Sequence, residues 1–289
     1  MIMRSQGMRL LVAHDGRDGG RDALELARIL ATPDPDASAL VVNVSATGLL
    51  PLEYALLSAE EATDAEPLFE EARDALAGME IETRAYGGSS PAGILTMLAE
   101  REDFDAIVVG SPHRGVFGRI LLGSVAKSLL NGAPADVAVA PKGYAQAPHE
   151  TLRDIAVGYD GTPEAKLALR RAEGLAKPPN ARLKLLTVVK PPVAAPVMVP
   201  GAYAPESPPE PDRVILEGIN SVDPALAAAP VRLDGDPARQ LMSACEEDPV
   251  DLLVLGSRGY GPLARVLLGS VSRRIVQDAP CPVLTVRRP

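Results

Sequence analysis

Short apolar runs alternate with longer amphipathic segments along the chain, and this alternation predicts an α/β fold. The apolar run at residues 8–14 ends at Asp15, and the segment after it repeats apolar residues every three or four positions, for example at Ala23, Ala27 and Leu30. Such a run is typical of a buried strand, and such a repeat is typical of a helix packed on a sheet. The first half is therefore predicted to hold strands at 8–14, 40–44, 80–85, 105–109 and 136–140, and helices at 18–30 with Asp18 as N-cap, at 52–77, at 91–101 and from Ser124.

The same order returns after residues 142–153, a polar segment with Pro and Gly that we interpret as a linker. Thr162 and Pro163 are typical of the N-cap and first turn of a helix. The second half is predicted to hold strands at 154–159, 183–189, 231–233, 251–255 and 281–286, and helices from Thr162, at 212–220 and at 236–247.

Strands that alternate with helices form parallel sheets covered on both faces. We therefore expect two Rossmann-like, doubly wound domains, residues 1–145 and 154–289. Each is expected to be a five-stranded parallel sheet flanked by helices, with a pseudo-two-fold axis relating the two. The segment from Pro191 to Pro211 breaks the symmetry, because its eight prolines cannot continue a helix, and we expect a surface loop there.

A duplicated motif follows the fourth strand of each half. Residues 110–128 read GSPHRGVFGRILLGSVAKS and residues 256–274 read GSRGYGPLARVLLGSVSRR, with a constant offset of 256 − 110 = 146 and 269 − 123 = 146. Each copy is a glycine-bearing loop followed by a helix. Glycines let backbone N–H groups turn outward, and the first N–H groups of a helix are unpaired and lie at the positive end of its dipole. The motif therefore predicts an anion site in each half, most plausibly for phosphate.

The residues at the start of each motif helix also favour an anion site. Ser124 and Ser270 are the expected N-caps, and three residues later stand Lys127 and Arg273 instead of the Glu or Gln of a capping box. A cation in the first turn opposes the helix dipole, so its presence there is explained if an anion binds nearby.

Composition limits the classes of partner. The net charge of −9 and the pI near 5.0 argue against nucleic acid, since such binding depends on neutralising phosphates over a broad surface. No apolar run reaches the length of about 18 residues that indicates a membrane span. The N-terminal segment shows no small-residue cleavage pattern, so we expect a cytoplasmic protein. Cys245 and Cys281 do not make a disulfide framework, and we expect reduced, buried thiols.

On these residues the whole chain resembles the universal stress protein family, as a tandem of two domains. The family's marker is Gly, two residues, Gly, nine residues, Gly and then Ser or Thr. It is complete in the second half at Gly256, Gly259, Gly269 and Ser270, whereas His113 replaces the second Gly in the first half.

The resemblance implies a site for ATP or a related adenine nucleotide, with or without Mg²⁺. The first-strand Asp would lie near the ribose or base, a second-strand Val would contact the adenine, and the glycine loop with Gly-Ser would hold the phosphates. The implied nucleotide-binding residues are Asp160, Val188, Gly256, Arg258, Gly259, Gly269, Ser270, Val271 and Ser272 in the second half, and Asp15, Val44, Gly110, His113, Gly123, Ser124 and Val125 in the first.

His113 leaves alternatives open for the first site. A side chain where the marker has glycine could crowd the phosphates and weaken the site, or its imidazole could donate to them. A metal bound by His14, Asp15 and His113 is a further reading with only thin support, since His and carboxylate are suitable ligands. We predict no metal site.

Three functions are compatible with these residues. The first is an ATP-binding regulatory module of a stress response. The second is a slow ATPase or nucleotidyl-transfer enzyme, for which Asp160, Arg258 and Arg273 are the candidates, although nothing resembles a nucleophile paired with a base. The third is a partner-binding scaffold that has lost nucleotide. We favour the first. The last strands of the two halves, 136–140 and 282–286, could pair as an intramolecular pseudo-dimer, and two chains could assemble further into a homodimer.

Overall fold

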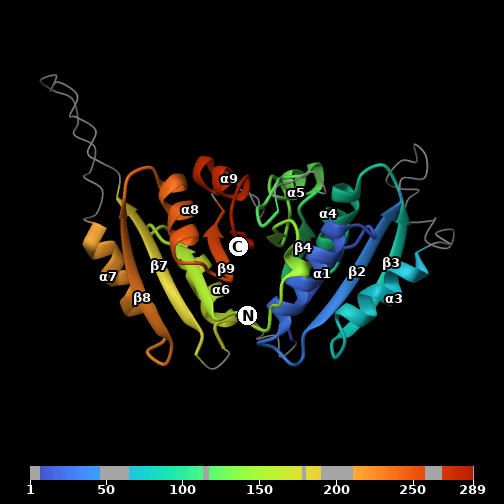
Figure 1. Cartoon of the computed structure of the whole chain (residues 1–289), viewed down its shortest axis with the longest axis horizontal. Coiled ribbons are helices and arrows are strands. Elements are labelled where there is room, and N and C mark those ends of the chain that lie inside the picture. The colour runs from blue at the N-terminus through green and yellow to red at the C-terminus, as the bar shows by residue number, and fades with distance from the viewer. Residues whose placement is uncertain are drawn as a thin grey trace, which may run out of the picture.

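A computed structural model describes residues 7–45, 65–112, 117–177, 180–189, 211–257 and 269–288. Strands and helices alternate along this part of the chain, as the apolar pattern predicts (Figure 1). The first half contains β1 (Arg9–Ala13), α1 (Asp18–Ala31), β2 (Ser38–Ser45), α3 (Glu66–Ala75), β3 (Glu80–Gly87), α4 (Pro91–Arg101), β4 (Ala106–Gly110), α5 (Ser124–Leu129) and β5 (Asp136–Ala140).

A short 3₁₀ turn, η2 (Tyr144–Gln146), follows β5 and precedes the second half. That half contains β6 (Asp154–Gly158), α6 (Pro163–Leu175), β7 (Arg182–Val189), α7 (Pro211–Ser221), β8 (Ala227–Asp234), α8 (Pro237–Glu247), β9 (Leu252–Gly256), α9 (Ser270–Val276) and β10 (Val283–Val286). β8 extends beyond the three residues predicted and includes Pro230, which is compatible with its place at the edge of the sheet.

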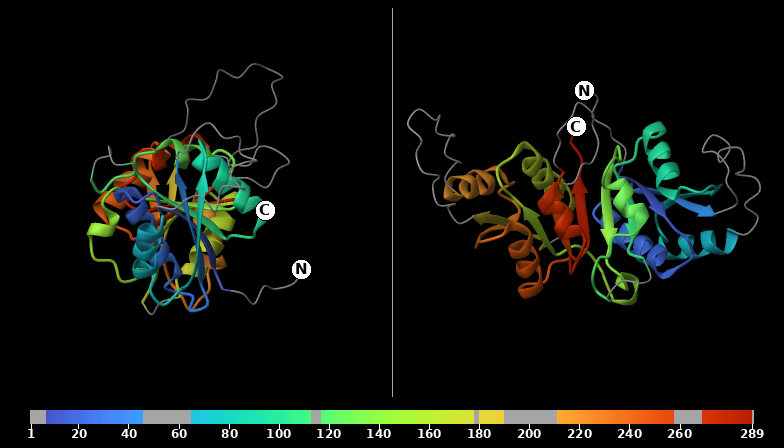
Figure 2. Two further views of the ribbon diagram at one scale, coloured as in Figure 1. Left: turned by 90° about the vertical axis from the view of Figure 1, so that its right-hand side faces the viewer. Right: turned by 90° about the horizontal axis from the view of Figure 1, so that it is seen from above.

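The strands form a sheet in the order β3-β2-β1-β4-β5-β10-β9-β6-β7-β8. All pairs within each half are parallel, so each half is the expected five-stranded, doubly wound sheet. The two halves meet at β5 and β10, which pair antiparallel with Leu284 opposite Ala138. Seen from above, the halves lie on either side of these two strands (Figure 2).

Helices cover both faces of the sheet, and two apolar cores result. One core packs α1, α3, α6 and α7 against side chains such as Leu10 and Val12 of β1. The other packs α4, α5, α8 and α9 against the opposite face, where Leu11 points. The alternation of side chains along each strand supplies both faces. Cys245 and Cys281 are free and buried in the second of these cores, as expected.

Three helix caps differ from the sequence prediction. Arg17, not Asp18, is the N-cap of α1, and the Asp15 side chain accepts a hydrogen bond from the Arg17 N–H instead. Gly123 and Gly269 are the N-caps of α5 and α9, which places the following serines inside the first turn. Both glycines have the extended backbone that is typical of an N-cap residue, with ψ of 169° and 168°. No side-chain hydrogen bond caps either helix. The predicted Thr162 cap is confirmed, since its side chain accepts from the Ala165 N–H.

The segment between β5 and β6 is docked on α1. The buried Asp22 carboxylate accepts hydrogen bonds from the N–H groups of Gly143 and Ala145, at 2.8 and 2.9 Å. The Tyr144 ring is buried and stacks on His149 with ring centroids 3.9 Å apart. This part of the predicted linker is therefore held by specific contacts. The domain boundaries on either side of it stay a prediction.

Replacing Asp22 with alanine is expected to lower the free energy of unfolding by about 2 kcal/mol, because it leaves donors of the docked segment without their acceptor. Asp22→Asn retains one acceptor oxygen and should lose less. Urea denaturation of both variants measures the difference. An Asp22→Ala variant as stable as the parent would show that the docking contributes nothing.

None of the helices in the described ranges is long and apolar enough to cross a membrane. The proline-rich segment, apart from Pro211 at the start of α7, and the predicted helical positions 52–64 lie outside these ranges.

Candidate functional site

A cavity of about 990 Å³ lies at the carboxyl ends of the first-half strands. Its lining comes from the ends of β1, β2 and β4, the starts of α1, α4 and α5, and the residues that precede and open α3. Six of the residues predicted from the sequence line it together: Asp15, Val44, Gly110, Gly123, Ser124 and Val125. In an open parallel sheet the ligand crevice lies at this edge, where strand order reverses, as it does here between β1 and β4.

A smaller cavity, of about 410 Å³, occupies the same place in the second half. Asp160, Val188, Gly256, Val271 and Ser272 line it. Gly269 and Ser270 lie at the N-terminus of α9, directly before the lining residue Val271. Both volumes are within the range of about 300–1,000 Å³ that is usual for small-molecule sites.

Three predicted site residues, His113, Arg258 and Gly259, lie outside the described residues. The structure therefore describes the strand end before each glycine loop and the helix after it.

The two first-strand acids are exposed at the mouths of the cavities. Asp15 Oδ1 accepts from the Arg17 N–H at 3.1 Å, and Asp160 Oδ1 accepts from the Thr162 N–H at 3.1 Å and its hydroxyl at 2.6 Å. Each acid therefore forms a turn with the residues that open the next helix, and this turn holds the carboxylate at the cavity. Asp15 and Asp160 therefore each combine a turn-forming hydrogen bond with a position in a cavity wall.

Gly110 ends β4 where the backbone of α1 comes very close. A Cβ atom at Gly110 would lie 1.9 Å from the carbonyl oxygen of Gly19, and one at Gly256 would lie 2.7 Å from the backbone of Glu164. No real side chain tolerates such contacts. The glycines that open the two motifs therefore have a structural role: they let the strand and the first helix of each half pack together at the site.

A Gly110→Ala variant is expected to lose about 2 kcal/mol of stability, because the backbone must shift to admit the methyl group. Gly132→Ala is the matched control, since nothing lies within 4 Å of a Cβ at that position. Urea denaturation should show a change of at most about 0.5 kcal/mol for the control. Equal effects at the two glycines would contradict the close approach.

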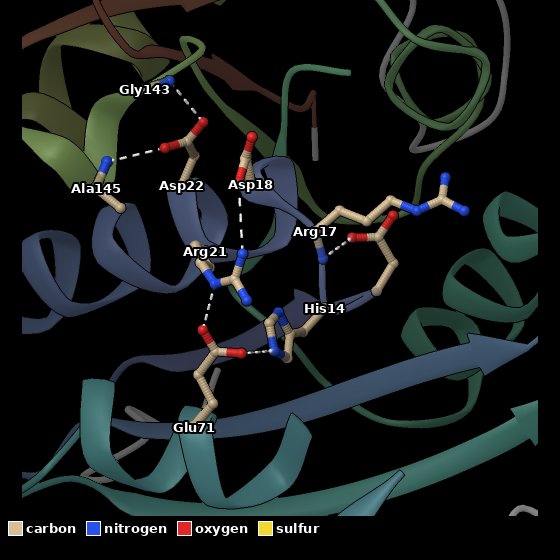
Figure 3. A network of polar contacts seen from close by, with 9 residues as sticks. His14, Arg17, Asp18, Arg21, Asp22, Glu71, Gly143 and Ala145 are labelled. Atoms are coloured by element: carbon tan, nitrogen blue, oxygen red, sulfur yellow. Dashed lines mark hydrogen bonds and ion pairs between the residues drawn. The ribbon is translucent and has the colours of Figure 1, made fainter. Parts of the chain in front are cut away.

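The sequence suggested His14 only as a possible metal ligand, and it gave no site role to Glu71 or Asn43 beside the first cavity. The His14 side chain is fully buried with Glu71 of α3 beside it, and Glu71 also binds Arg21 of α1 (Figure 3). The Asn43 side chain donates to the His14 carbonyl, and Thr187 donates to Tyr159 in the same way in the second half. A polar residue inside an otherwise apolar strand, as at Asn43, was the available signal.

Within the described residues no group of three or more His, Cys, Asp or Glu side chains could hold a metal ion. Since His113 is not described, the reading of a metal bound by His14, Asp15 and His113 receives no support from the structure.

Comparison with known proteins agrees with this architecture. The universal stress protein family matches residues 8–141 and again residues 151–287. A universal stress protein of Mycobacterium tuberculosis is 29% identical over 207 residues, which cover 68% of this chain and 69% of that protein. The universal stress protein YxiE of Bacillus subtilis is 34% identical over 142 residues, 45% of this chain and 96% of that protein.

The crystal structure of a universal stress protein from Archaeoglobus fulgidus superposes with a TM-score of 0.70 at 22% identity, covering 97% of this chain and 98% of the other. At that identity the likeness supports the fold alone. The two family matches account for nearly the whole chain and coincide with the two halves of the sheet. The chain belongs to the universal stress protein family and carries two of its domains in tandem.

Proposed function

We propose that this protein binds ATP or a related adenine nucleotide at the carboxyl edge of its sheet and acts as a regulatory module of a stress response. The observation that carries the proposal is the first cavity, which brings together six predicted residues from separate parts of the chain: Asp15, Val44, Gly110, Gly123, Ser124 and Val125. These residues are the ones that the resemblance to the universal stress protein family implies for a nucleotide site.

The chemistry of the lining suggests how the nucleotide lies. Val44 and Leu95 offer apolar surface for the base, and Asp15 offers a carboxylate that can accept from a ribose hydroxyl. Gly123 and Ser124 present the start of α5 to the phosphates, and Arg17, which also lines the cavity, adds a positive charge. Mg²⁺, when present, would neutralise charge on the phosphates.

The second cavity repeats the pattern. Val188 and Leu241 supply apolar surface and Asp160 the acid, while Ser272 lines the wall formed by α9. We propose a nucleotide site here as well. The second half has the complete family marker, with Gly259 at the position that His113 occupies in the first half.

We propose further that the two halves act as an intramolecular pseudo-dimer. The antiparallel pairing of β5 with β10 supports this, because it covers one edge of each five-stranded sheet. An ion pair between Arg171 of α6 and Asp136 of β5 also joins the halves. Assembly of two chains into a homodimer stays a prediction.

Binding without efficient turnover is the form of the proposal that the site supports best. Of the described candidates for catalysis, Asp160 already accepts two hydrogen bonds from Thr162, and Arg273 contacts Asn131 of the first half at 3.5 Å. Neither is paired as an activated base or as a cation aimed into a cavity.

Isothermal titration calorimetry of the purified, nucleotide-free chain tests the proposal. We expect saturable binding of ATP, with weaker binding of GTP, and no more than slow release of phosphate over hours. Absence of binding by every adenine nucleotide would contradict the proposal, whereas rapid hydrolysis would establish the enzyme reading instead.

A further inference from the structure

His14 is a buried titratable side chain in the wall of the first cavity. Its side chain is fully shielded from solvent; within the described residues Nδ1 has no hydrogen-bond partner, and Nε2 has only a long contact of 3.4 Å to Glu71 Oε2. Burying an imidazole with poorly satisfied ring nitrogens costs free energy, and a shorter Glu71 contact to a protonated ring would lower that cost.

Charged groups surround the ring on three elements (Figure 3). From α3, the Oε2 atom of Glu71 lies 3.4 Å from Nε2 of His14. From α1, Arg21 donates to the other oxygen of Glu71 at 2.5 Å and also pairs with Asp18. From the strand end, Asp15 adds a second carboxylate.

Uncharged groups complete the surroundings. Gly20 of α1 packs its backbone against the ring, and β2 contributes the amide of Asn43 to the His14 carbonyl. Glu71 thus links α3 to α1 through Arg21, and it would link α3 to the end of β1 whenever the imidazole carries a proton.

We expect the charge of the bound ligand to decide whether the His14 imidazole carries a proton. Burial lowers the pKa of His14, and the Glu71 and Asp15 carboxylates oppose that shift. Around neutral pH the imidazole is therefore uncharged in the empty cavity. A polyanion in the same cavity adds negative charge and raises the affinity of the ring for a proton. By linkage, protonation of the ring must then raise the affinity for the polyanion by the same factor.

The second half lacks this device. Tyr159 occupies the position of His14, since 159 − 14 = 145, and Gly218 gives its ring room: a Cβ there would lie 2.6 Å from the ring. Leu68 of α3 lies beside Gly16 as Val214 of α7 lies beside Gly161, so the two helices align with an offset of 214 − 68 = 146. With this offset, Ala72 in the first half corresponds to Gly218. Burial raises the pKa of Tyr159 above its ordinary value, so this phenol stays neutral over the range in which histidine titrates.

We propose that His14 is a proton-linked positioning residue of the first cavity: nucleotide binding there takes up a proton at His14 and draws Glu71 of α3 toward the strand end, whereas binding in the second cavity does not. The inference rests on the proposed nucleotide site and deepens it, because it makes the two sites of one chain respond differently to pH.

Two single-site proteins test it. Gly269→Asp leaves the first site and Gly123→Asp leaves the second. ATP binding to each is measured by calorimetry at pH 6.0 and pH 8.0, in two buffers of different ionisation heat, which reports the protons taken up. Titration of the ATP phosphates is common to both proteins, so the difference between them belongs to the protein.

We expect the first-site protein to gain about fivefold or more in affinity between pH 8.0 and pH 6.0 relative to the second-site protein, with an excess of proton uptake. His14→Asn should remove this difference, and Glu71→Gln should reduce it. Glu217→Gln, which changes the Glu of α7 beside Tyr159, is the matched control and should leave the second site unaltered in its pH response.

The His14→Tyr, Ala72→Gly double variant installs the second-half pair and serves if His14→Asn does not fold. Equal pH responses of the two sites, a pH response that survives in the His14 variants, or binding at the second site alone would each overturn the inference and leave the proposed function standing. Failure of both proteins to bind ATP, when the parent chain also fails, would overturn both.

Discussion

Replacing Gly269 with aspartate is expected to lower the affinity of the second site for ATP by about 100-fold or more. Gly269 is the N-cap of α9, with a φ of −66° that aspartate adopts readily, and aspartate is a preferred N-cap residue. The helix should therefore persist. The new carboxylate would lie where the phosphates are proposed to bind, and two like charges about 4 Å apart repel by about 4 kcal/mol near a protein surface. Calorimetric titration with ATP measures the loss.

Gly269→Asn is the matched control, because asparagine has the same shape and caps equally well but has no charge. It should bind ATP much better than the aspartate variant. Gly123→Asp and Gly123→Asn repeat the comparison at α5, where the N-cap has a φ of −70°. Equal affinity of the Asp and Asn variants would show that no phosphate lies at the helix start.

Arg171→Met is expected to lower the free energy of unfolding by about 3 kcal/mol at pH 7. Arg171 Nε donates to Asp136 Oδ2 at 2.7 Å, and the Asp136 side chain is 2% exposed. Its other oxygen accepts from the Arg287 N–H at 2.9 Å. Removing the guanidinium leaves a buried carboxylate short of its countercharge at the junction between the halves, and methionine retains most of the apolar stem. Urea denaturation at pH 7 measures the change.

The pH dependence gives this effect a sign. Burial raises the pKa of the Asp136 carboxyl, while Arg171 opposes the shift. A raised pKa means that the folded chain holds this proton more tightly than the unfolded chain, so the stability tied to the protonated form is lost as pH rises through the folded-state pKa. The deficit of Arg171→Met should therefore shrink as pH falls toward 4, where Asp136 gains a proton and needs no partner.

Arg170→Met is the neighbouring control on α6, and its exposed side chain should contribute within about 0.5 kcal/mol. A double-mutant cycle with Asp136→Asn isolates the coupling between the pair. Additive losses in that cycle, or a deficit that does not vary with pH, would show that the ion pair does not hold the halves together.

Much of the fold could be predicted from the sequence because its strong signals are local. The apolar runs of β1 and β4 and the periodic residues of α1 reflect burial on a sheet, and the duplicated motif at an offset of 146 revealed the two halves. The strand ends then placed Asp15 and Gly110 at one edge, since parallel strands share the direction of their carboxyl ends. Both residues line the first cavity, as this topology requires.

What could not be predicted depends on contacts between distant segments. The N-cap of α5 is Gly123 and not the predicted Ser124, because an extended backbone at Gly123, and no side-chain hydrogen bond, begins the helix. The docking of Tyr144 on α1 through Asp22 joins residues more than 100 positions apart, and nothing local in a polar linker announces it. His14 looked like the last residue of an apolar strand, and only the packing of α3 showed that a carboxylate faces it.

The most direct test of the account is a crystal structure of the chain grown with excess ATP. We predict electron density for the nucleotide in the cavities, with the base beside Val44 or Val188, the ribose near Asp15 or Asp160, and the phosphates at the glycines that begin α5 or α9. Well-ordered cavities that remain free of nucleotide at saturating ATP would contradict the central claim.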